Sequence, residues 1–208
     1  GGASTVTHTG SNEFSGRMPG GQSDSQTDAT TSQKGLKAVV QLTVSGGEIQ
    51  ISSADDAVHT NGHVLISGGN LTLATGDDGV HADQSLTVSG ATICITQSYE
   101  GLEGAQISLT GGEIRICASD DGINASDGES VDFMGGGPAG KLASSALWLH
   151  ISGGLVVIDA QGDGLDSNGS ITISGGVVLV NGPTSSGNGA LDFGSSMNVD
   201  GGILIAVG

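Results

Sequence analysis

A short glycine-containing mark recurs along this chain at a nearly constant spacing. The marks begin at Ser45, Ser67, Ser89, Thr110, Ser152, Ser174 and Asp200. The interval from Thr110 to Ser152 is twice as long as a usual one, and the last interval is slightly longer than the others. A fixed period of this kind is typical of solenoids, in which each repeat is one structural unit that stacks on its neighbours. The sequence therefore predicts a stack of similar coils, with an insertion between Thr110 and Ser152.

The apolar residues on both sides of each mark alternate with other residues, which is the period of a β-strand rather than of a helix. Leu42 and Val44 precede the first mark, and Ile49 and Ile51 follow it. A third short strand in each repeat holds one apolar residue, namely Leu36, Val58, Val80, Leu102, Ile123, Leu165 or Leu191. Three short strands in about 22 residues predict an all-β chain, folded as a parallel β-helix of about seven coils. We expect right-handed coils, because parallel crossovers are almost always right-handed.

The repeat also predicts how the chain is divided. Residues 34–208 are expected to form the β-helix. Residues 1–33 lack the repeat and are dominated by Gly, Ser, Thr, Gln and Asp, as expected of a spacer or a loosely attached strap. Residues 126–146 are irregular as well, and we expect them to form a loop that leaves the helix.

The charge balance excludes some classes of partner. The chain has 5 Lys and Arg against 22 Asp and Glu, so its formal net charge is −17. It therefore offers no basic surface to a nucleic acid. No apolar run approaches the roughly 18 residues that a membrane span needs. Cys94 and Cys117 lie on adjacent coils but two positions out of register, so we expect free thiols.

Acidic residues gather around the third strand of each repeat. Aligned by repeat, the corner before this strand holds Asp56, Asp78, Glu100, Asp121 and Asp163. The position before the corner holds Asp55, Asp77, Tyr99 and Asp120. The outward position three places after the corner holds His59, His81, Glu103, Asn124, Asp166 and Asp192. Carboxylates stacked about 4.8 Å apart repel one another, so these columns need solvent, raised pKa values or a bound cation.

The oxygen-rich columns predict a calcium site, because Ca²⁺ takes about six to eight oxygen ligands. The candidate ligands are all the Asp and Glu residues of the three columns, together with Asn124. The strongest cluster is Glu100, Glu103, Asp120, Asp121 and Asn124, and a second is Asp163 and Asp166 with Asp192. The alternative is a row of solvated turn residues, since Asp-Gly is a common turn dipeptide.

Basic and aromatic residues beside the columns are further candidates. We expect His59 and His81 to be solvated imidazoles near carboxylates, with binding of a softer metal as the alternative. In the first repeat Lys34 and Lys37 occupy two of the acidic columns. We call the three acidic columns together the acidic ladder. The two lysines either neutralise the end of this ladder or act as a base or a carboxylate-binding cation. Tyr99 could stack on a sugar, whereas we expect Trp148 to cover the core.

Five motifs support a resemblance to a known family. They are Asp-Asp-Gly-Val-His-Ala-Asp (77–83), Tyr-Glu-Gly-Leu-Glu-Gly (99–104), Asp-Asp-Gly-Ile-Asn-Ala (120–125), Gly-Leu-Asp-Ser-Asn-Gly-Ser-Ile-Thr-Ile-Ser-Gly-Gly (164–176) and Asn-Gly-Pro-Thr-Ser-Ser-Gly-Asn-Gly-Ala-Leu-Asp (181–192). With these motifs the chain resembles secreted bacterial carbohydrate-binding β-helix proteins, allied in fold to pectate lyases, over about residues 34–208. The resemblance implies a Ca²⁺-containing β-helix, outside the cell or on its surface, that binds acidic sugars such as polygalacturonate and also cellulose.

The first functional hypothesis is therefore a carbohydrate-binding module that does not cleave its ligand. Ca²⁺ would bridge a carboxylate of the protein and one of an acidic polysaccharide, with Lys37, His59, His81 and Tyr99 as further ligand contacts. A calcium-dependent lyase is an alternative. It would need a basic residue beside the metal to remove a proton, and the candidates are Lys37, Lys34 and Arg115.

A structural, self-associating protein is the other hypothesis. In the last three repeats the outward positions of the second strand turn apolar, at Leu155, Val157, Val177, Leu179, Ile203 and Ile205. An exposed apolar patch of this kind needs a cover. We expect the cover to be residues 126–146 with Phe133 and Met134, the N-terminal segment with Phe14 and Met18, or a second copy of the chain.

Overall fold

Alternating apolar residues form short parallel strands along the whole repeat. The computed structural model describes residues 3–7, 33–127, 146–185 and 187–208, and none of these residues is helical. The strands are β1 (Ala3–Thr7), β2 (Leu36–Ala38), β3 (Gln41–Ser53), β4 (Val58–Thr60), β5 (His63–Thr75), β6 (Val80–Val88), β7 (Thr92–Gln97), β8 (Leu102–Leu109), β9 (Glu113–Ala118), β10 (Ile123–Ala125), β11 (Trp148–Ile151), β12 (Leu155–Ala160), β13 (Leu165–Ser167), β14 (Ser170–Asn181) and β15 (Ser196–Val207). Among the described residues, no helix is long and apolar enough to cross a membrane.

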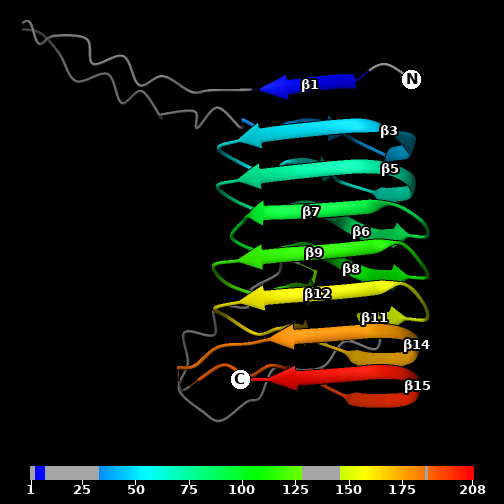
Figure 1. Ribbon diagram of the computed structural model, residues 1–208, viewed down its shortest axis with the longest axis vertical. Coiled ribbons are helices and arrows are strands. Elements are labelled where there is room, and N and C mark those ends of the chain that lie inside the picture. The colour runs from blue at the N-terminus through cyan, green and yellow to red at the C-terminus, as the bar shows by residue number, and fades with distance from the viewer. Residues whose placement is uncertain (1–2, 8–32, 128–145, 186) are drawn as a thin grey trace, which may run out of the picture.

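The strands stack in three columns. Figure 1 shows the stack from the side, with β3, β5, β7, β9, β12 and β14 one above another. The second strand of each coil follows its glycine mark, and these strands pair in the order β1, β3, β5, β7, β9, β12, β14 and β15. The first strands precede the marks and lie in β3, β5, β6, β8, β11, β14 and β15. The third strands lie in β2, β4, β6, β8, β10 and β13, and Leu191 adds a bridge to Leu165.

The pairing register follows the repeat. Ile49 of β3 lies opposite Leu71 of β5, and Leu71 lies opposite Ile93 of β7. Ile93 in turn lies opposite Ile114 of β9. The long interval between the fourth and fifth marks does not disturb this column, because Ile114 lies opposite Val156 of β12. The predicted all-β parallel solenoid, with a rise of one coil per repeat, is confirmed.

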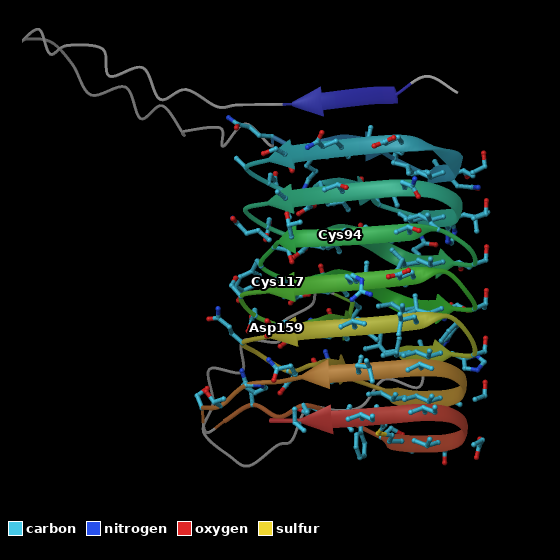
Figure 2. All side chains as sticks on the ribbon, in the orientation of Figure 1. Cys94, Cys117 and Asp159 are labelled. Carbon is cyan, nitrogen blue, oxygen red and sulfur yellow. The ribbon has the colours of Figure 1, made fainter. Side chains whose placement is uncertain are left out.

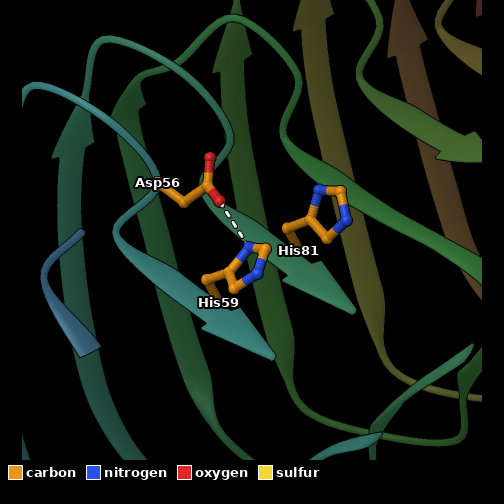
Figure 3. Close-up of side chains that lie close together, drawn as sticks. All are labelled: Asp56, His59 and His81. Carbon is orange, nitrogen blue, oxygen red and sulfur yellow. Dashed lines mark hydrogen bonds and ion pairs between the residues drawn. The ribbon is translucent and has the colours of Figure 1, made fainter. Parts of the chain in front are cut away.

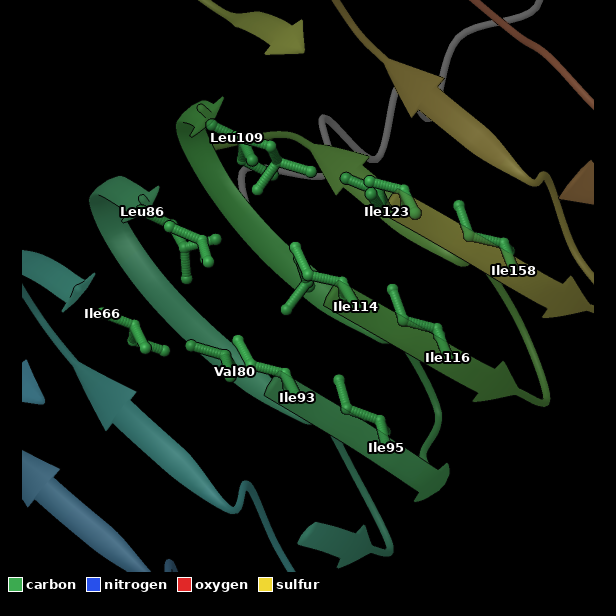
Figure 4. Packing of buried hydrophobic residues seen from close by; sticks show 14 of the residues in the cluster. Ile66, Val80, Leu86, Ile93, Ile95, Leu109, Ile114, Ile116, Ile123 and Ile158 are labelled. Atoms are coloured by element: carbon green, nitrogen blue, oxygen red, sulfur yellow. The ribbon is translucent and has the colours of Figure 1, made fainter. Parts of the chain in front are cut away.

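The core is a set of apolar columns inside the solenoid. Ile95, Ile116 and Ile158 stack on successive second strands, and each is at most 4 % exposed. Figure 4 shows these columns beside Leu86 and Leu109, which come from the first strands. Burial of each large aliphatic side chain contributes about 1.5–3 kcal/mol to folding. Because every coil adds the same inward residues, the core continues from one coil to the next.

The structure describes only parts of the two segments that we expected to lie outside the repeat. Residues 3–7 form β1, which pairs in parallel with β3 and so extends the column of second strands. The remainder of residues 1–33 that carries Phe14 and Met18, and residues 128–145 with Phe133 and Met134, lie outside the described residues. Their expected role as a cover of the apolar surface therefore stays a prediction.

Both cysteines lie on the second strands (Figure 2). Cys94 of β7 pairs in register with Arg115, and Cys117 of β9 pairs with Asp159 of β12. The two thiols are thus two positions apart in register on adjacent strands. Both are free, as the sequence predicted.

One glycine shows how closely the coils approach at the corner. A Cβ atom at Gly122 would lie 2.6 Å from the carbonyl oxygen of Gly164 and would also overlap the side chain of Ile158. A Cβ atom at Gly46 would meet nothing within 4 Å. The space between coils therefore admits only glycine at position 122.

We expect Gly122→Ala to lower the free energy of unfolding by about 1–3 kcal/mol, which is the usual cost of overpacking. Gly46→Ala is the matched control and should change it by less than about 0.5 kcal/mol. Chemical denaturation followed by circular dichroism measures both variants. Equal stabilities for the two variants would contradict the close packing of these coils.

Candidate metal and ligand site at the acidic corner

The corner before each third strand is built from backbone hydrogen bonds to stacked carboxylates. The backbone N–H of Asp78 donates to Oδ1 of Asp56 at 3.3 Å, and the N–H of Glu100 donates to Oδ1 of Asp78 at 3.3 Å. Further along, the N–H of Asp163 donates to Oδ1 of Asp121 at 2.6 Å. Each of these aspartates therefore ties its own coil to the next one, and this bonding fixes the corner column.

At the start of the ladder, positive charge compensates the carboxylates. Lys34 Nζ lies 2.9 Å from Asp55 and 2.5 Å from Asp56. Burial alone would lower the pKa of Lys34, but the hydrogen bonds to Asp56 and Asp55 outweigh burial and raise it. This geometry matches the expectation that Lys34 neutralises the end of the ladder. Lys37 is exposed and lies in register with His59.

The two histidines lie side by side near these carboxylates (Figure 3). His59 Nδ1 is 2.7 Å from Asp56 Oδ2, and the ring centroids of His59 and His81 are 4.9 Å apart. Burial and the charge of Lys34 lower the pKa of His59. Asp56, His59 and His81 each offer one ligand atom within 4.8 Å of the others. The protonated Lys34 beside Asp56 makes this group a poor site for a second cation.

His81 is the centre of an ion-pair network. Its Nδ1 contacts Asp78 at 3.1 Å and also contacts Glu103, and its Nε2 lies 3.0 Å from Asp83. Burial opposes protonation, but Asp78 and Glu103 raise the pKa of His81 to about 11. The charged imidazole in turn outweighs burial and lowers the pKa of Glu103. Glu103 also accepts a hydrogen bond from Ser126 at 3.1 Å. One imidazolium thus faces three carboxylates, and burial together with the charge of Glu103 still raises the pKa of Asp78 to about 7. This part of the ladder is an ion-pair network in which His81 offsets part of the repulsion.

The next level of the ladder leaves oxygen atoms without partners. Asn124 Nδ2 donates to Glu100 Oε1 at 3.0 Å. The other oxygens of the pair, Glu100 Oε2 and Asn124 Oδ1, are buried, and neither has a hydrogen-bond partner. Burial, together with the charge of Glu103, raises the pKa of Glu100 to about 9. Two buried lone-pair donors in one place are suited to a hard cation, which would satisfy both.

A group of three aspartates lies on the following coils. Asp121, Asp163 and Asp166 each offer a carboxylate oxygen within 4.8 Å of the other two. Asp166 is 5 % exposed, and burial raises the pKa of Asp121 to about 7. Asn124 lies opposite Asp166 in the register of β10 and β13. The three aspartates therefore continue the strip of oxygens that Glu100 and Asn124 begin.

The predicted clusters are regrouped in the structure. Within the strongest predicted cluster, Glu103 turns to His81, and Asp120 lies beside the Tyr99 hydroxyl and raises the pKa of Tyr99 to about 12. Tyr99 is 48 % exposed. Asp163 and Asp166 group with Asp121, whereas the side chain of Asp192 is exposed. A further group of three, Asp55, Asp56 and Asp77, lies beside Lys34.

Sequence reasoning missed two residues of this network. Asp83 contacts His81 and accepts a hydrogen bond from Asn61 at 3.0 Å. Asp83 follows His81 by two positions, so strand alternation could have placed both on the same side. Ser126, the partner of Glu103, lies just after β10, where the repeat carries no signal. Trp148 begins β11, and because it alternates with buried Leu149 its partly buried side chain lies on the outer surface of the coil.

Comparison with known proteins gives one match. Residues 1–79 match a family model described as a carbohydrate-binding domain-containing protein. No curated protein and no solved structure matches the chain. The matched segment includes Lys34, His59 and the corner residues Asp55, Asp56, Asp77 and Asp78. This match supports a carbohydrate-binding role.

The raised pKa values predict a pH-dependent stability. Glu100 in the folded protein keeps a proton up to about pH 9, whereas an unfolded Glu loses it near its ordinary pKa of about 4.3. Because the folded state binds more protons in this window, its free energy of unfolding falls as the pH rises. His81, with a pKa of about 11, acts in the same direction.

We therefore expect the melting temperature in EDTA to fall between about pH 5 and about pH 9. Glu100→Gln mimics the protonated acid and should make this fall shallower. Glu48→Gln changes an exposed glutamate and should leave the slope as it is. Thermal melts across a buffer series provide the measurement. An unchanged slope in Glu100→Gln would show that Glu100 is not the group responsible.

Proposed function

We propose that the protein is an extracellular, non-catalytic module that binds acidic polysaccharide through calcium held at the acidic corner. The carbohydrate-binding match over residues 1–79 supports the general role. The unpartnered buried oxygens of Glu100 and Asn124 are the single observation that carries the calcium part of the proposal.

The donor set at this corner fits calcium better than a softer metal. Glu100, Asn124, Asp121, Asp163 and Asp166 offer only oxygen atoms for an ion, and hard cations prefer oxygen ligands. Histidine nitrogens, which softer metals prefer, lie instead beside Lys34 or within the ion-pair network of His81. Residues 100–124 and 163–166 would therefore hold the ion, while the earlier coils need none.

Calcium would supply a positive charge at which an acidic sugar and an acidic protein can meet. The chain itself, with a net charge of −17, repels a polyanion at long range. The ladder residues hold their carboxylates in one row along the solenoid axis, about 4.8 Å apart. A polymer with a regularly repeated carboxylate is the kind of ligand that such a row can match. Polygalacturonate has this character.

Few of the basic residues that the structure describes are placed for cleavage of the ligand. Among the described basic residues, Lys34 is held by two aspartates, and Arg115 is paired with Glu113 at 2.8 Å on the column of second strands. Lys37 is the remaining candidate for the base of a lyase, and it lies beside His59 rather than beside Glu100. We therefore propose that the protein binds its polysaccharide and does not cleave it.

A lyase assay separates these two functions. Incubation with polygalacturonate and Ca²⁺ should give no increase in the ultraviolet absorbance of unsaturated uronide. Lys37→Ala should weaken polygalacturonate binding by no more than about fivefold, the loss of one exposed charge contact, and should leave the absorbance unchanged. An absorbance increase that Lys37→Ala abolishes would establish the lyase in place of the binding module.

Calcium binding itself is tested by replacement of two ladder residues. The double variant Asp121→Asn and Asp166→Asn should bind Ca²⁺ at least about tenfold more weakly, because two ligand charges are lost. Its melting temperature in Ca²⁺ should then rise less above the value in EDTA than that of the original protein. Asp159→Asn is the matched control, since Asp159 is exposed and bonds Asn181 on the second strands.

Circular dichroism first checks that the double variant is folded, and the single variant Asp121→Asn replaces it if it is not. Polygalacturonate binding, followed by calorimetry, should need Ca²⁺ in the original protein and should weaken in the same variants. An equal rise in melting temperature for the original protein and the ladder variants would overturn the calcium site.

Self-association is a second candidate function, favoured by one observation. Ile203 and Ile205 on β15 are 55 % and 56 % exposed. They continue, in register, the outward columns of Leu155 and Val177 and of Val157 and Leu179. A second copy could cover this uncharged stripe without bringing the two acidic corners together. Sedimentation should then show a dimer that Ile203→Lys converts to a monomer, and a monomeric original protein would exclude it.

A further inference from the structure

The outward side of the first strands is mostly neutral and polar, unlike the acidic corner and unlike the apolar stripe of the second strands. We call it the first-strand face and define it by the outward side chains that precede each glycine mark. One of its columns holds Gln41, His63, Ser85, Gln106, Trp148 and Ser170, which are register partners in this order. The neighbouring column carries His150 and Thr172. Among the described residues, no carboxylate occupies either column from Gln41 to Thr172.

The first-strand face contains a shallow hollow between two coils. The hollow has a volume of about 300 Å³ and is lined by Trp148, Leu149 and His150 of β11 and by Ser170 and Thr172 of β14. Leu149 is buried and contributes backbone, whereas the other four side chains stand outward and are partly exposed. A pocket of this size accommodates a ligand the size of a single ring rather than a large cofactor.

The lining combines one aromatic ring with several neutral hydrogen-bonding groups. Trp148 lies opposite Ser170, and His150 lies opposite Thr172. The indole ring and the two hydroxyl groups are therefore neighbours on two adjacent strands. His150 Nε2 lies 3.0 Å from Ser174 Oγ, and this contact holds the imidazole in place. An indole offers a flat apolar surface with a polar edge, while hydroxyl groups can both donate and accept hydrogen bonds.

These features match a neutral sugar ring. The C–H side of a pyranose can lie against the indole of Trp148, and its hydroxyl groups can bond to Ser170, Thr172 and His150. A uronate is disfavoured here, because the hollow offers no cation and the net charge of the chain is −17. The hollow also lies outside residues 1–79, so the family match does not account for it.

We propose that the hollow at Trp148 is a subsite for one neutral hexopyranose residue of a glycan chain, and that it binds without a metal. This inference goes beyond the calcium-dependent site, because it concerns other strands, another class of sugar and another source of affinity. The protein would then carry two sugar-binding surfaces, one for charged and one for neutral polysaccharide.

The single tryptophan of the chain makes a direct test possible. Emission from Trp148 reports this hollow alone, and EDTA removes any contribution of the calcium site. Cellohexaose, laminarihexaose and mannohexaose are the neutral probes, and hexagalacturonate is the acidic comparison. We expect at least one neutral probe to change the emission in a saturable way in EDTA, and hexagalacturonate to leave it unchanged.

Variants at the hollow separate stacking from hydrogen bonding. Thr172→Val keeps the tryptophan and should weaken binding of the neutral probe about three- to tenfold, the cost of one or two hydrogen bonds. Thr87→Val changes an outward threonine of the same face away from the hollow and should have no effect. By calorimetry, Trp148→Ala should lose binding and Trp148→Phe should retain part of it, with circular dichroism as the check on folding.

Three results would overturn the proposal. They are unchanged emission with all three neutral probes, equal binding by Trp148→Ala and the original protein, or a response to hexagalacturonate alone. The outcome is independent of the calcium site, because every titration is done in EDTA. Loss of calcium binding in the Asp121→Asn and Asp166→Asn variant would therefore not affect binding of the neutral probes.

Discussion

Hydrogen bonding between successive coils, in a register that follows the repeat, is the constraint on which the rest of the structure depends. Once Ile49 lies opposite Leu71, every equivalent position of the two coils must align as well. The same rule builds the aliphatic core and brings like charges together at the corner. Each residue in this fold must therefore be compatible with the residues stacked above and below it, as well as with its neighbours in its own coil.

The acidic corner shows how the protein manages this consequence. A stacked carboxylate is useful because it accepts the backbone N–H of the next coil, as Asp56 and Asp121 do. Its charge is costly because another carboxylate lies one coil away. Lys34 and His81 compensate this repulsion in the early coils. Burial raises the pKa of Asp78 to about 7 even beside His81, and it raises the pKa values of Glu100 and Asp121 as well. Glu100 and Asp121 lie in the part of the corner that would gain most from a cation.

The fold could be predicted almost completely because it depends on periodicity, which the sequence carries openly. The composition of the acidic columns followed from the same alignment. The partners within the columns did not, because they depend on side-chain rotamers. Glu103 follows Glu100 closely in the sequence, yet its side chain turns to His81 of the preceding coil. The outward position of Trp148, by contrast, follows from its alternation with Leu149 and Ile151.

The long interval between the fourth and fifth glycine marks has a consequence for how such a chain can change over time. Leu109 and Ile151 are register partners although about one additional coil length of sequence separates them. The coils before and after this junction keep their pairing, so added sequence at a corner costs the stack little. Each corner of the solenoid is in effect an independent place where new segments can be acquired without redesign of the scaffold. A solenoid whose coils can change separately can readily present two surfaces of different chemistry on one small protein.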